Sequence, residues 1–489
     1  MFATVTSVAL VGVEPRPVRV EVHVGVPRKG FALVGLPDTA VREAKDRVRA
    51  AVLSSGFPFP NRRVTVNLAP ADLPKAGSAY DLPIALGVLA AAGSVPPNAG
   101  SVVALGELAL DGAVRSARGG LGAGIVARDA GVPCLLPQAS AGEASRVPGA
   151  QVRAVRSLSE AIAVTQGAPG APVPAREATV PGERFDLAEV RGQSAGRRAL
   201  EIAAAGAHHL LLWGPPGAGK TMLALRLPGI LPPLDEETAL EVAQVWGAAG
   251  RPAPASSAPP FRAPHHSATM PAIVGGGSGV PVLGEISLAH RGVLFLDELG
   301  EFPVNILDAL RQPLEAGSVV IARKGVSVRF PSDIQLVAAT NPCPCGFAGD
   351  RVKPCSCSTT SIQRYRRRIS GPLLDRFDLR VPIPRPERSE LLGPPGEASV
   401  SIAERVLAAR APQRARGGPN GRLGRGQLDE LEWTPGARRL LEAAVERFAL
   451  TGRGFDRVRR VARTVGDLDG SASVDEPHVA EALSFRGEW

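Results

Sequence analysis

The chain has 489 residues, 44% of them hydrophobic and 21% charged, which is the composition of a soluble globular protein with two or three domains. No uninterrupted apolar stretch reaches the roughly 18 residues of a membrane-spanning helix, and the N-terminus lacks the basic and apolar parts of a secretory signal. We therefore expect a cytoplasmic protein with no membrane partner. The net charge of +9 comes almost entirely from arginine, which suits contacts with a polyanion but equally a GC-rich coding sequence.

The first third of the chain alternates β-like runs with helical ones. Val18–Val24 is an example of the first kind and Thr39–Leu53 of the second. We predict an α+β domain over residues 1–165. The stretch Gly167–Arg176 is rich in Pro, Gly and Ala and cannot pack a core, so residues 166–182 are predicted to be a linker.

A phosphate-binding loop follows this linker. The strand-like run His209–Trp213 leads directly into a Gly-rich segment ending in Lys220 and Thr221, and helical sequence comes next. Glycines let the backbone N–H groups face phosphates, with a helix N-terminus behind them. We predict that Lys220 contacts the β- and γ-phosphates of ATP and that the Thr221 hydroxyl binds Mg²⁺. The predicted ATP-binding residues of the loop are Gly214, Pro215, Pro216, Gly217, Ala218, Gly219, Lys220 and Thr221.

Two further strand-like runs end in polar residues that belong beside the phosphates. The apolar run before Asp297 and Glu298 predicts a buried parallel strand, with Asp297 holding Mg²⁺ and Glu298 polarising the attacking water. A later strand, Ile334–Thr340, ends at Asn341, whose amide is predicted to position that water. This order and spacing predict an α/β AAA+ ATPase core with a parallel sheet over residues 183–385.

Arginines complete the predicted ATPase. Arg376 lies in Leu373-Leu-Asp-Arg-Phe-Asp, which resembles the arginine-finger segment of magnesium chelatases and replicative helicases. Such an arginine acts on the ATP of a neighbouring subunit, an effect of roughly three to five orders of magnitude, and requires a ring. In the helical lid predicted over residues 390–489, AAA+ proteins keep a cis-acting arginine called sensor 2, for which Arg457 is our first choice and Arg460 our second. A solvated helix face is the alternative for each arginine.

Four cysteines fall close together after Asn341. Their pattern is C-x-C, nine intervening residues and a second C-x-C, formed by Cys343, Cys345, Cys355 and Cys357. In a cytosolic protein such clustering favours a metal over disulfides, and four thiolates would make a structural Zn²⁺ site with no open position. The C-x-C spacing is tighter than that of most zinc sites, which weakens this interpretation. Cys134 stands alone and is expected to be a small buried core residue.

Several longer segments resemble one known family. Phe261–His266, Gly275–Gly277, Pro281–Glu298 and Ser370–Asp378 closely resemble the ComM/YifB family, whose ATPase module is similar to the magnesium-chelatase motor subunit. The resemblance covers essentially the whole chain. It implies a hexameric ATPase that translocates on DNA and promotes branch migration when incoming DNA is integrated during natural transformation.

The sequence also contains segments suited to DNA. Glu315–Arg329 predicts a β-hairpin with Arg323 and Lys324 at its tip, and in related rings such a hairpin points into the pore. A basic tip would grip the phosphates of single-stranded or branched DNA without selecting sequence. Arg262–Gly277 is expected to form a second pore loop. The run Arg364–Arg368 suits either a DNA-binding surface or a charged helix at the subunit interface.

The N-terminal domain resembles a Lon-protease domain without its catalytic pair. Ala69–Leu86 resembles the segment that carries the nucleophilic serine of Lon, but the aligned position is Ala79, and the aligned lysine position is Gly122. A Ser–Lys dyad needs both groups, so we predict no peptidase activity. Ser78 with Lys75 is the remaining combination, and these residues are too close along one turn to favour it.

Three other functions compete with a motor on DNA. A chelatase motor fits the ATPase signatures, but such subunits do not carry a Lon-like N-terminal domain. An ATP-dependent protease is disfavoured by Ala79 and Gly122. An AAA+ remodeller of protein complexes stays open. DNA-stimulated ATP hydrolysis favours the motor on DNA, whereas stimulation by a protein partner alone favours the remodeller.

Overall fold

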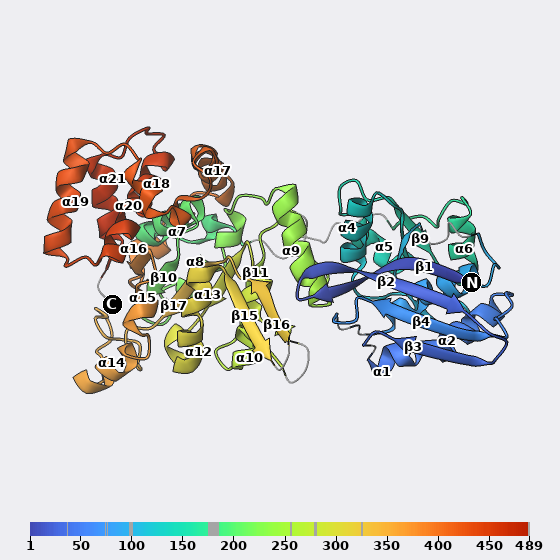
Figure 1. The fold of residues 1–489 in the computed structure, drawn as a ribbon. Coiled ribbons are helices and arrows are strands. Elements are labelled where there is room, and N and C mark those ends of the chain that lie inside the picture. Colours follow the sequence, from blue (N-terminus) through green and yellow to red (C-terminus); the bar gives the residue numbers. More distant parts are fainter. Residues whose placement is uncertain are drawn as a thin grey trace. The chain divides into compact units, whose positions relative to one another are not determined.

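The computed structural model describes residues 1–36, 38–73, 75, 77–96, 101–174, 185–254, 257–277, 281–323 and 326–487. The chain forms two compact units, Met1–Thr179 with Glu236–Ser256, and Val180–Asp235 with Ser257–Trp489. Both combine helices with sheets, as predicted for an α/β chain (Figure 1). Among the described residues, no helix combines the length and the apolar character that crossing a membrane would require.

The first unit is built on a seven-stranded mixed sheet with strand order β3-β4-β2-β1-β5-β8-β9. The long antiparallel pair β1–β2 lies at its centre, and the apolar helix α3 packs against both strands. The strands of this unit are β1 (Phe2–Val11), β2 (Glu14–Val24), β3 (Gly30–Val34), β4 (Arg63–Ala69), β5 (Val103–Ala104), β6 (Glu107–Leu108), β7 (Val114–Arg115), β8 (Cys134–Pro137) and β9 (Val152–Val155). Its helices are α1 (Thr39–Arg42), α2 (Ala44–Ser54), α3 (Asp81–Ala91), α4 (Gly120–Ala130), α5 (Gln138–Ala144), α6 (Leu158–Thr165) and α9 (Glu236–Ala248).

Helix α9 belongs to this first unit, although its residues fall inside residues 183–385, the predicted ATPase core. Its Ala243 is buried with Leu121 and Ile125 of α4 and with Val147. Beyond the helix, the Arg146 guanidinium donates a hydrogen bond to the backbone oxygen of Pro254 (3.3 Å). An amphipathic helix needs an apolar partner, and α4 supplies it here.

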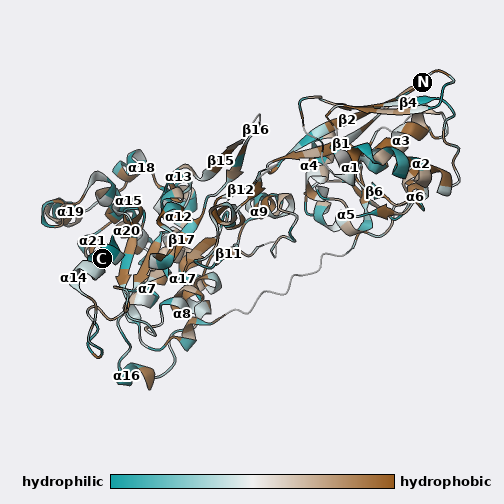
Figure 2. Cartoon of the chain, turned by 90° about the horizontal axis from the view of Figure 1, so that it is seen from below, coloured by the Kyte–Doolittle hydropathy of each residue, from teal (hydrophilic) through white to brown (hydrophobic). Residues whose placement is uncertain are grey.

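The second unit contains a five-stranded parallel sheet with strand order β11-β14-β17-β10-β18. These strands are mostly in the apolar colour in Figure 2, as expected for a sheet buried on both faces. The strands of this unit are β10 (Leu210–Trp213), β11 (Phe261–Arg262), β12 (Gly275–Gly276), β13 (Val282–Leu283), β14 (Val293–Leu296), β15 (Ser318–Arg323), β16 (Val326–Pro331), β17 (Gln335–Thr340) and β18 (Leu379–Pro382).

The second unit has two sets of helices (Figure 1). One set surrounds this sheet, and the other forms a helical group at the C-terminal end of the chain. In that group α20 packs against α21, α17 and α7, and its apolar side chains share one core with strands β10 and β18. The helices are α7 (Ser194–Gly206), α8 (Lys220–Ala224), α10 (Met270–Ile273), α11 (Glu285–Leu288), α12 (Val304–Ala309), α13 (Arg311–Ala316), α14 (Thr359–Arg366), α15 (Gly371–Leu374), α16 (Arg388–Leu391), α17 (Ser399–Ala415), α18 (Arg425–Asp429), α19 (Pro435–Arg447), α20 (Gly452–Leu468) and α21 (Glu476–Ser484).

Two short hairpins complete the second unit. Strands β15 and β16 form the predicted antiparallel hairpin, in which Ser318 pairs with Pro331 and Arg323 with Val326. It extends away from the sheet in Figure 2. The smaller β12–β13 hairpin lies beside it. A Cβ on Gly275 would come within 3.0 Å of the Ile321 side chain, which shows how close the two hairpins are. The predicted tip residue Lys324 lies outside the described residues.

Candidate nucleotide site

The Gly-rich loop connects the carboxyl end of β10 to the start of α8. The backbone N–H of Gly214 donates to the Thr340 oxygen (3.2 Å), which joins the loop to β17. A Cβ at Gly214 would overlap the backbone oxygen of Ile383, so a larger residue does not fit there. Gly217 and Gly219 have φ of 75° and 93°, a conformation that favours glycine. These glycines turn the chain sharply into the N-terminus of α8.

Lys220 is held inside this loop. Its side chain is buried, and Nζ donates to the backbone oxygens of Gly214 (2.7 Å) and Pro215 (2.9 Å) and to Oδ1 of Asn341 (3.1 Å). Burial lowers the pKa of Lys220 to about 8, against the opposing effect of nearby Asp297 and Glu298. A phosphate oxygen can replace any of these neutral acceptors. The loop therefore fits a phosphate group, and it brings Lys220 and Asn341 together.

Thr221 and Asp297 meet beside the loop. The Thr221 hydroxyl donates to Oδ2 of Asp297 at 2.8 Å, and the other carboxylate oxygen accepts from the backbone N–H of Glu298 (2.9 Å). Asp297 directly follows β14, two strands from β10 in the sheet. A hydroxyl and a carboxylate are the oxygen ligands that Mg²⁺ prefers. The pair fits a Mg²⁺ ion on the phosphates.

Glu298 has a partner that was not predicted from the sequence. Its Oε2 lies 3.1 Å from Nδ1 of His266, and the Glu298 side chain is 54% exposed. Glu298 also adopts a left-handed backbone (φ 52°), which is unusual for a residue with a side chain and occurs at functional sites. His266 lies in the Phe261–His266 segment, which carries part of the family resemblance. That resemblance was the only sign in the sequence that His266 has a functional role.

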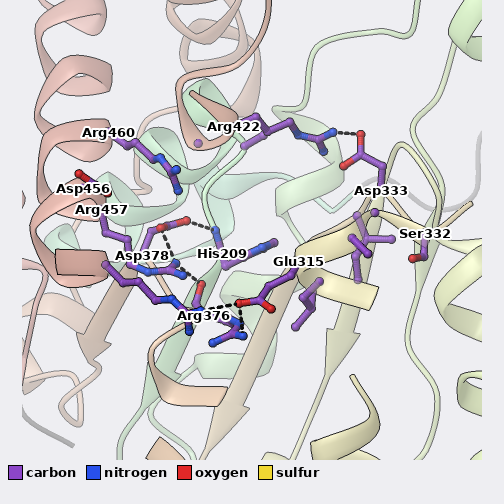
Figure 3. Close-up of a pocket in the computed structure, with 17 residues that line it drawn as sticks. His209, Glu315, Ser332, Asp333, Arg376, Asp378, Arg422, Asp456, Arg457 and Arg460 are labelled. Carbon is purple, nitrogen blue, oxygen red and sulfur yellow. Dashed lines mark hydrogen bonds and ion pairs between the residues drawn. The ribbon is translucent and has the colours of Figure 1, made fainter. Parts of the chain in front are cut away.

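The predicted arginines lie in a pocket at the opposite edge of the sheet (Figure 3). His209 immediately precedes β10 and Asp378 immediately precedes β18, and the His209 backbone N–H donates to Asp378 Oδ2 (3.0 Å). These are the amino ends of the strands, whereas Lys220 follows a carboxyl end. The pocket is lined by Ala207, His209, Leu314, Glu315, Ala316, Gly317, Ser332, Asp333, Ile334, Arg376, Asp378, Gly421, Arg422, Arg453, Asp456, Arg457 and Arg460.

Arg376 and Arg457 contact each other in this pocket. Arg376 pairs with the Glu315 carboxylate and donates to the backbone oxygen of Pro372 (2.9 Å). Arg457 donates to the backbone oxygen of Arg376 (2.5 Å) and to Oδ1 of Asp378 (2.8 Å). The buried Nε atoms of both arginines have no hydrogen-bond partner within the described part of the chain. Two arginines thus lie together in one pocket, each with a buried Nε that is unpaired among the described residues.

Arg460 and Asp378 complete the charge balance of the pocket. Nε of Arg460 donates to the backbone oxygen of Leu423 (2.9 Å). Burial disfavours the Asp378 carboxylate, but Arg457 and His208 more than offset this and hold the pKa of Asp378 well below its usual range. Within the described residues, neither Arg376, Arg457 nor Arg460 forms a hydrogen bond to the phosphate loop of its own chain.

The four clustered cysteines lie in the loop that follows Asn341. Their sulfur atoms all fall within 4.8 Å of one another. Cys343 is buried and the other three are partly buried. The loop returns to the phosphate loop at Gly346, where a Cβ would come within 2.6 Å of the Pro216 ring. This cluster is suited to a tetrahedral metal ion and adjoins the nucleotide site.

Comparison with known proteins identifies the family. Three family models match: "Magnesium chelatase, subunit ChlI" over residues 186–391, "Subunit ChlI of Mg-chelatase" over residues 18–140 and "Magnesium chelatase, subunit ChlI C-terminal" over residues 396–486. The chain is 41% identical to the competence protein ComM of Haemophilus influenzae over 99% of its own length and 97% of that protein. It is also 41% identical to the protein YifB of Escherichia coli, over 98% of its own length and 96% of that protein.

The chain belongs to the ComM/YifB family.

This family has a magnesium-chelatase-like AAA+ core, so membership implies an ATPase that uses ATP and Mg²⁺. The residues Lys220, Thr221 and Asp297 described above fit these ligands.

The chain also matches part of a protease. An archaeal Lon protease of Methanocaldococcus jannaschii is 31% identical over 100 residues, which is 20% of this chain and 13% of that protein. At the two positions that the motif resemblance aligns with the catalytic pair of Lon, the chain has Ala79 and Gly122. A Cβ at Gly122 would lie 3.0 Å from Cβ of Pro15 and 3.2 Å from Cδ2 of Leu10. The β1–β2 hairpin therefore fills the space that a lysine side chain would need.

Ser78 and Lys75 each have another partner. The Ser78 hydroxyl bonds the carboxylate of Glu107, and the buried Lys75 amine donates to the backbone oxygen of Pro70. The two side chains are thus committed to separate interactions and do not form a dyad.

Proposed function

We propose that the protein is a cytoplasmic, ATP-driven hexameric ring motor on DNA, which promotes branch migration of incoming DNA during natural transformation. One observation carries the ring: the phosphate-binding residues and the paired arginines lie at opposite edges of one parallel sheet. A site divided in this way needs the arginine edge of a second copy. The name of the Haemophilus influenzae relative, a competence protein, favours the pathway.

Within one subunit, the loop would hold ATP and Mg²⁺. The backbone N–H groups of Gly217 and Gly219 and the Lys220 ammonium would bind phosphate oxygens, while Thr221 and Asp297 would bind the metal. Bound Mg²⁺ would neutralise part of the phosphate charge. Glu298 would accept a proton from the attacking water, with His266 orienting its carboxylate, and the Asn341 amide would position that water.

Arg376 would act on the ATP of the neighbouring subunit. Arg376 and Arg457 line the same pocket, so both guanidinium groups would act on the same phosphate. The sequence predicts a cis-acting sensor 2 role for Arg457 or its alternative Arg460. Because both line the pocket with Arg376, we propose that they act across the interface instead. A head-to-tail contact that repeats in this way closes into a ring when the rotation permits. The hexameric state is taken from the family resemblance.

The two neighbouring hairpins are our candidates for DNA contact. Arg329 is exposed on β16, directly across from the half-exposed Val320 of β15. The sequence predicts Arg323 and Lys324 at the tip of the same hairpin, which would carry up to three positive charges with Arg329. Such a hairpin would bind the phosphate backbone independently of sequence.

Steady-state ATP hydrolysis with and without single-stranded and branched DNA tests this proposal. We expect DNA to stimulate the rate, and Lys220→Ala and Arg376→Ala each to abolish the stimulation. Arg439→Ala, an exposed arginine of α19, serves as the control. A basal rate indifferent to DNA would contradict the motor and favour the remodeller of protein complexes.

Mixing the two inactive variants tests the shared site. An Arg376→Ala subunit keeps Lys220, so its site can be completed by Arg376 of a Lys220→Ala neighbour. We therefore expect the mixture to recover part of the activity. A mixture of Lys220→Ala with the Lys220→Ala/Arg376→Ala double variant contains no complete site and should stay inactive. No recovery in the first mixture would count against action across the interface.

A further inference from the structure

The four cysteines after Asn341 form a site that the proposed motor activity does not explain. We propose that Cys343, Cys345, Cys355 and Cys357 bind one structural Zn²⁺ ion, and that this ion holds the loop 342–357 against the phosphate loop. The second half of this proposal deepens the proposed ATPase and rests on it.

The sulfur atoms have the spacing of a tetrahedral metal site. The Sγ–Sγ distances are 3.4 Å for Cys343–Cys345, 3.5 Å for Cys345–Cys355 and 3.7 Å for Cys343–Cys355. Zn–S bonds of about 2.3 Å give tetrahedral edges of about 3.8 Å. A disulfide would bring two sulfurs to about 2.05 Å. The sulfurs are therefore close to metal-ligand spacing and far from disulfide spacing.

The surrounding backbone favours thiolates. The backbone N–H of Ala348 donates to Sγ of Cys343 (3.3 Å), and that of Cys357 donates to Sγ of Cys355 (3.4 Å). Hydrogen bonds to sulfur stabilise its anionic form, which is the form that binds metal. A Zn²⁺ ion with four thiolates also leaves no open position, so the site is structural and not catalytic.

The loop has little else to hold it in place. From Pro344 to Ser358, all of them described, only Gly346 is buried. The Asp350 carboxylate accepts from the backbone N–H groups of Val352 and Lys353 and pairs with Arg385 (3.3 Å). A segment without an apolar core needs another source of order, and metal binding supplies this in many small domains.

Two contacts connect this loop to the nucleotide site. Asn341 lies two residues before Cys343, and its Oδ1 accepts from Nζ of Lys220 (3.1 Å). Gly346 lies directly after Cys345 and packs on Pro216, where a Cβ would come within 2.6 Å of the ring. Through Cys343 and Cys345, the metal therefore holds the segment 341–346, which touches the phosphate loop at Asn341 and at Gly346. Loss of the metal would displace Asn341.

Metal analysis of the full chain, purified without chelators, tests the site. We expect about one zinc per chain. The Cys355→Ser/Cys357→Ser double variant should lose the metal, whereas Cys134→Ala should keep it, since Cys134 is buried in the other unit. In the wild-type protein a chelator should make all four thiols reactive together, and Zn²⁺ alone should protect them again. Thiols that stay fully reactive after Zn²⁺ is added, or iron in place of zinc, would overturn the assignment.

The link to the ATP site is tested by Gly346→Ala. Gly346 and Gly349 both have positive φ (85° and 78°), but a Cβ at Gly349 meets nothing within 4 Å, so Gly349→Ala is the matched control. We expect Gly346→Ala to retain zinc and to weaken the binding of a fluorescent ATP analogue by about tenfold relative to that control. Equal affinity in the two variants would overturn the coupling. Zinc content and analogue binding are both measured without DNA, so this proposal and the motor fail separately.

Discussion

The carboxylate of Glu315 forms an ion pair with the guanidinium of Arg376 at the amino-terminal edge of the sheet. Glu315 is half-exposed and also lies 3.2 Å from Arg453, whereas Arg376 is buried. If Arg376 acts on the ATP of a neighbour, Glu315 competes with that phosphate. The pair then holds the arginine back until two subunits meet.

Replacing Glu315 by Gln should therefore raise ATP hydrolysis. A half-exposed ion pair contributes up to about 1 kcal/mol, so we expect a rise of about two- to fivefold. Steady-state rates at saturating DNA give the measurement, with the exposed Glu446→Gln as control. A lower rate would mean that Glu315 orients Arg376 instead of competing for it.

The buried Asp378 should be important for stability. Because Asn would leave Arg457 without its carboxylate partner, we expect Asp378→Asn to cost about 3–5 kcal/mol. Thermal unfolding at neutral pH checks this. Asp375→Asn removes a more exposed carboxylate, which pairs with Arg380 at 3.3 Å, and should cost under about 1 kcal/mol.

The same carboxylate predicts an acid dependence. The pKa of Asp378 is depressed in the folded protein, so its contribution to stability is fully present above the unfolded pKa of about 3.9. It is lost as the pH falls below that value toward the folded pKa. The melting temperature of the wild-type protein should accordingly fall more steeply between about pH 4 and about pH 2 than that of Asp378→Asn. Parallel curves would show that Asp378 does not titrate there.

Binding of ATP should weaken at alkaline pH. The pKa of Lys220 is lowered to about 8, and the charged ammonium is the form that binds phosphate. Above that pH the affinity for ATP should decrease, by up to about tenfold for each further pH unit. Titration with a fluorescent ATP analogue measures it, and Lys220→Arg, which stays charged, should show no such decline. The same decline in both proteins would assign the effect to another group.

His266 should affect the rate more than the binding of ATP. Its Nδ1 contacts Glu298, so His266→Asn should lower kcat by about tenfold with little change in KM. The neighbouring His265 bonds Ser267 at 2.8 Å and not Glu298, which makes His265→Asn the control. An equal loss of kcat in the two variants would show that His266 does not position Glu298.

Restoring the two aligned catalytic residues should not create a protease. In Ala79→Ser/Gly122→Lys the new lysine would meet Pro15 and Leu10. We expect no cleavage of casein and a melting temperature lowered by several degrees, roughly the effect of about 1–3 kcal/mol of overpacking. Ala79→Ser alone, which adds one oxygen, should melt close to the wild type. Casein cleavage by the double variant would show that the hairpin leaves the site open.

The local elements of the nucleotide site could be predicted from the sequence. The strand–loop–helix context of Lys220 and the apolar strand before Asp297 are short-range patterns, and the structure has strands and turns at those places. The contact between His266 and Glu298 joins residues over 30 positions apart. No periodicity predicts such a contact, because it depends on how β11 lies beside β14.

Tertiary packing decided what the sequence left open. The sequence predicts a helical lid that contains Arg457, but not that Arg457 would reach Arg376 and Asp378 at the amino-terminal edge of the sheet. That outcome follows from the packing of α20 on α7 and α17. In the same way, α9 has an apolar face like many helices, and its partner α4 lies more than 100 residues earlier.

The placement of α9 has a consequence for synthesis and for dissection of the protein. The chain passes between its two units three times, after residues 179, 235 and 256. On the ribosome, the first unit cannot be completed until α9 has emerged, by which time the Gly-rich loop has already been made. A fragment ending near residue 179 would present Leu121 and Ile125 to water, so the N-terminal unit should be expressed with α9 attached.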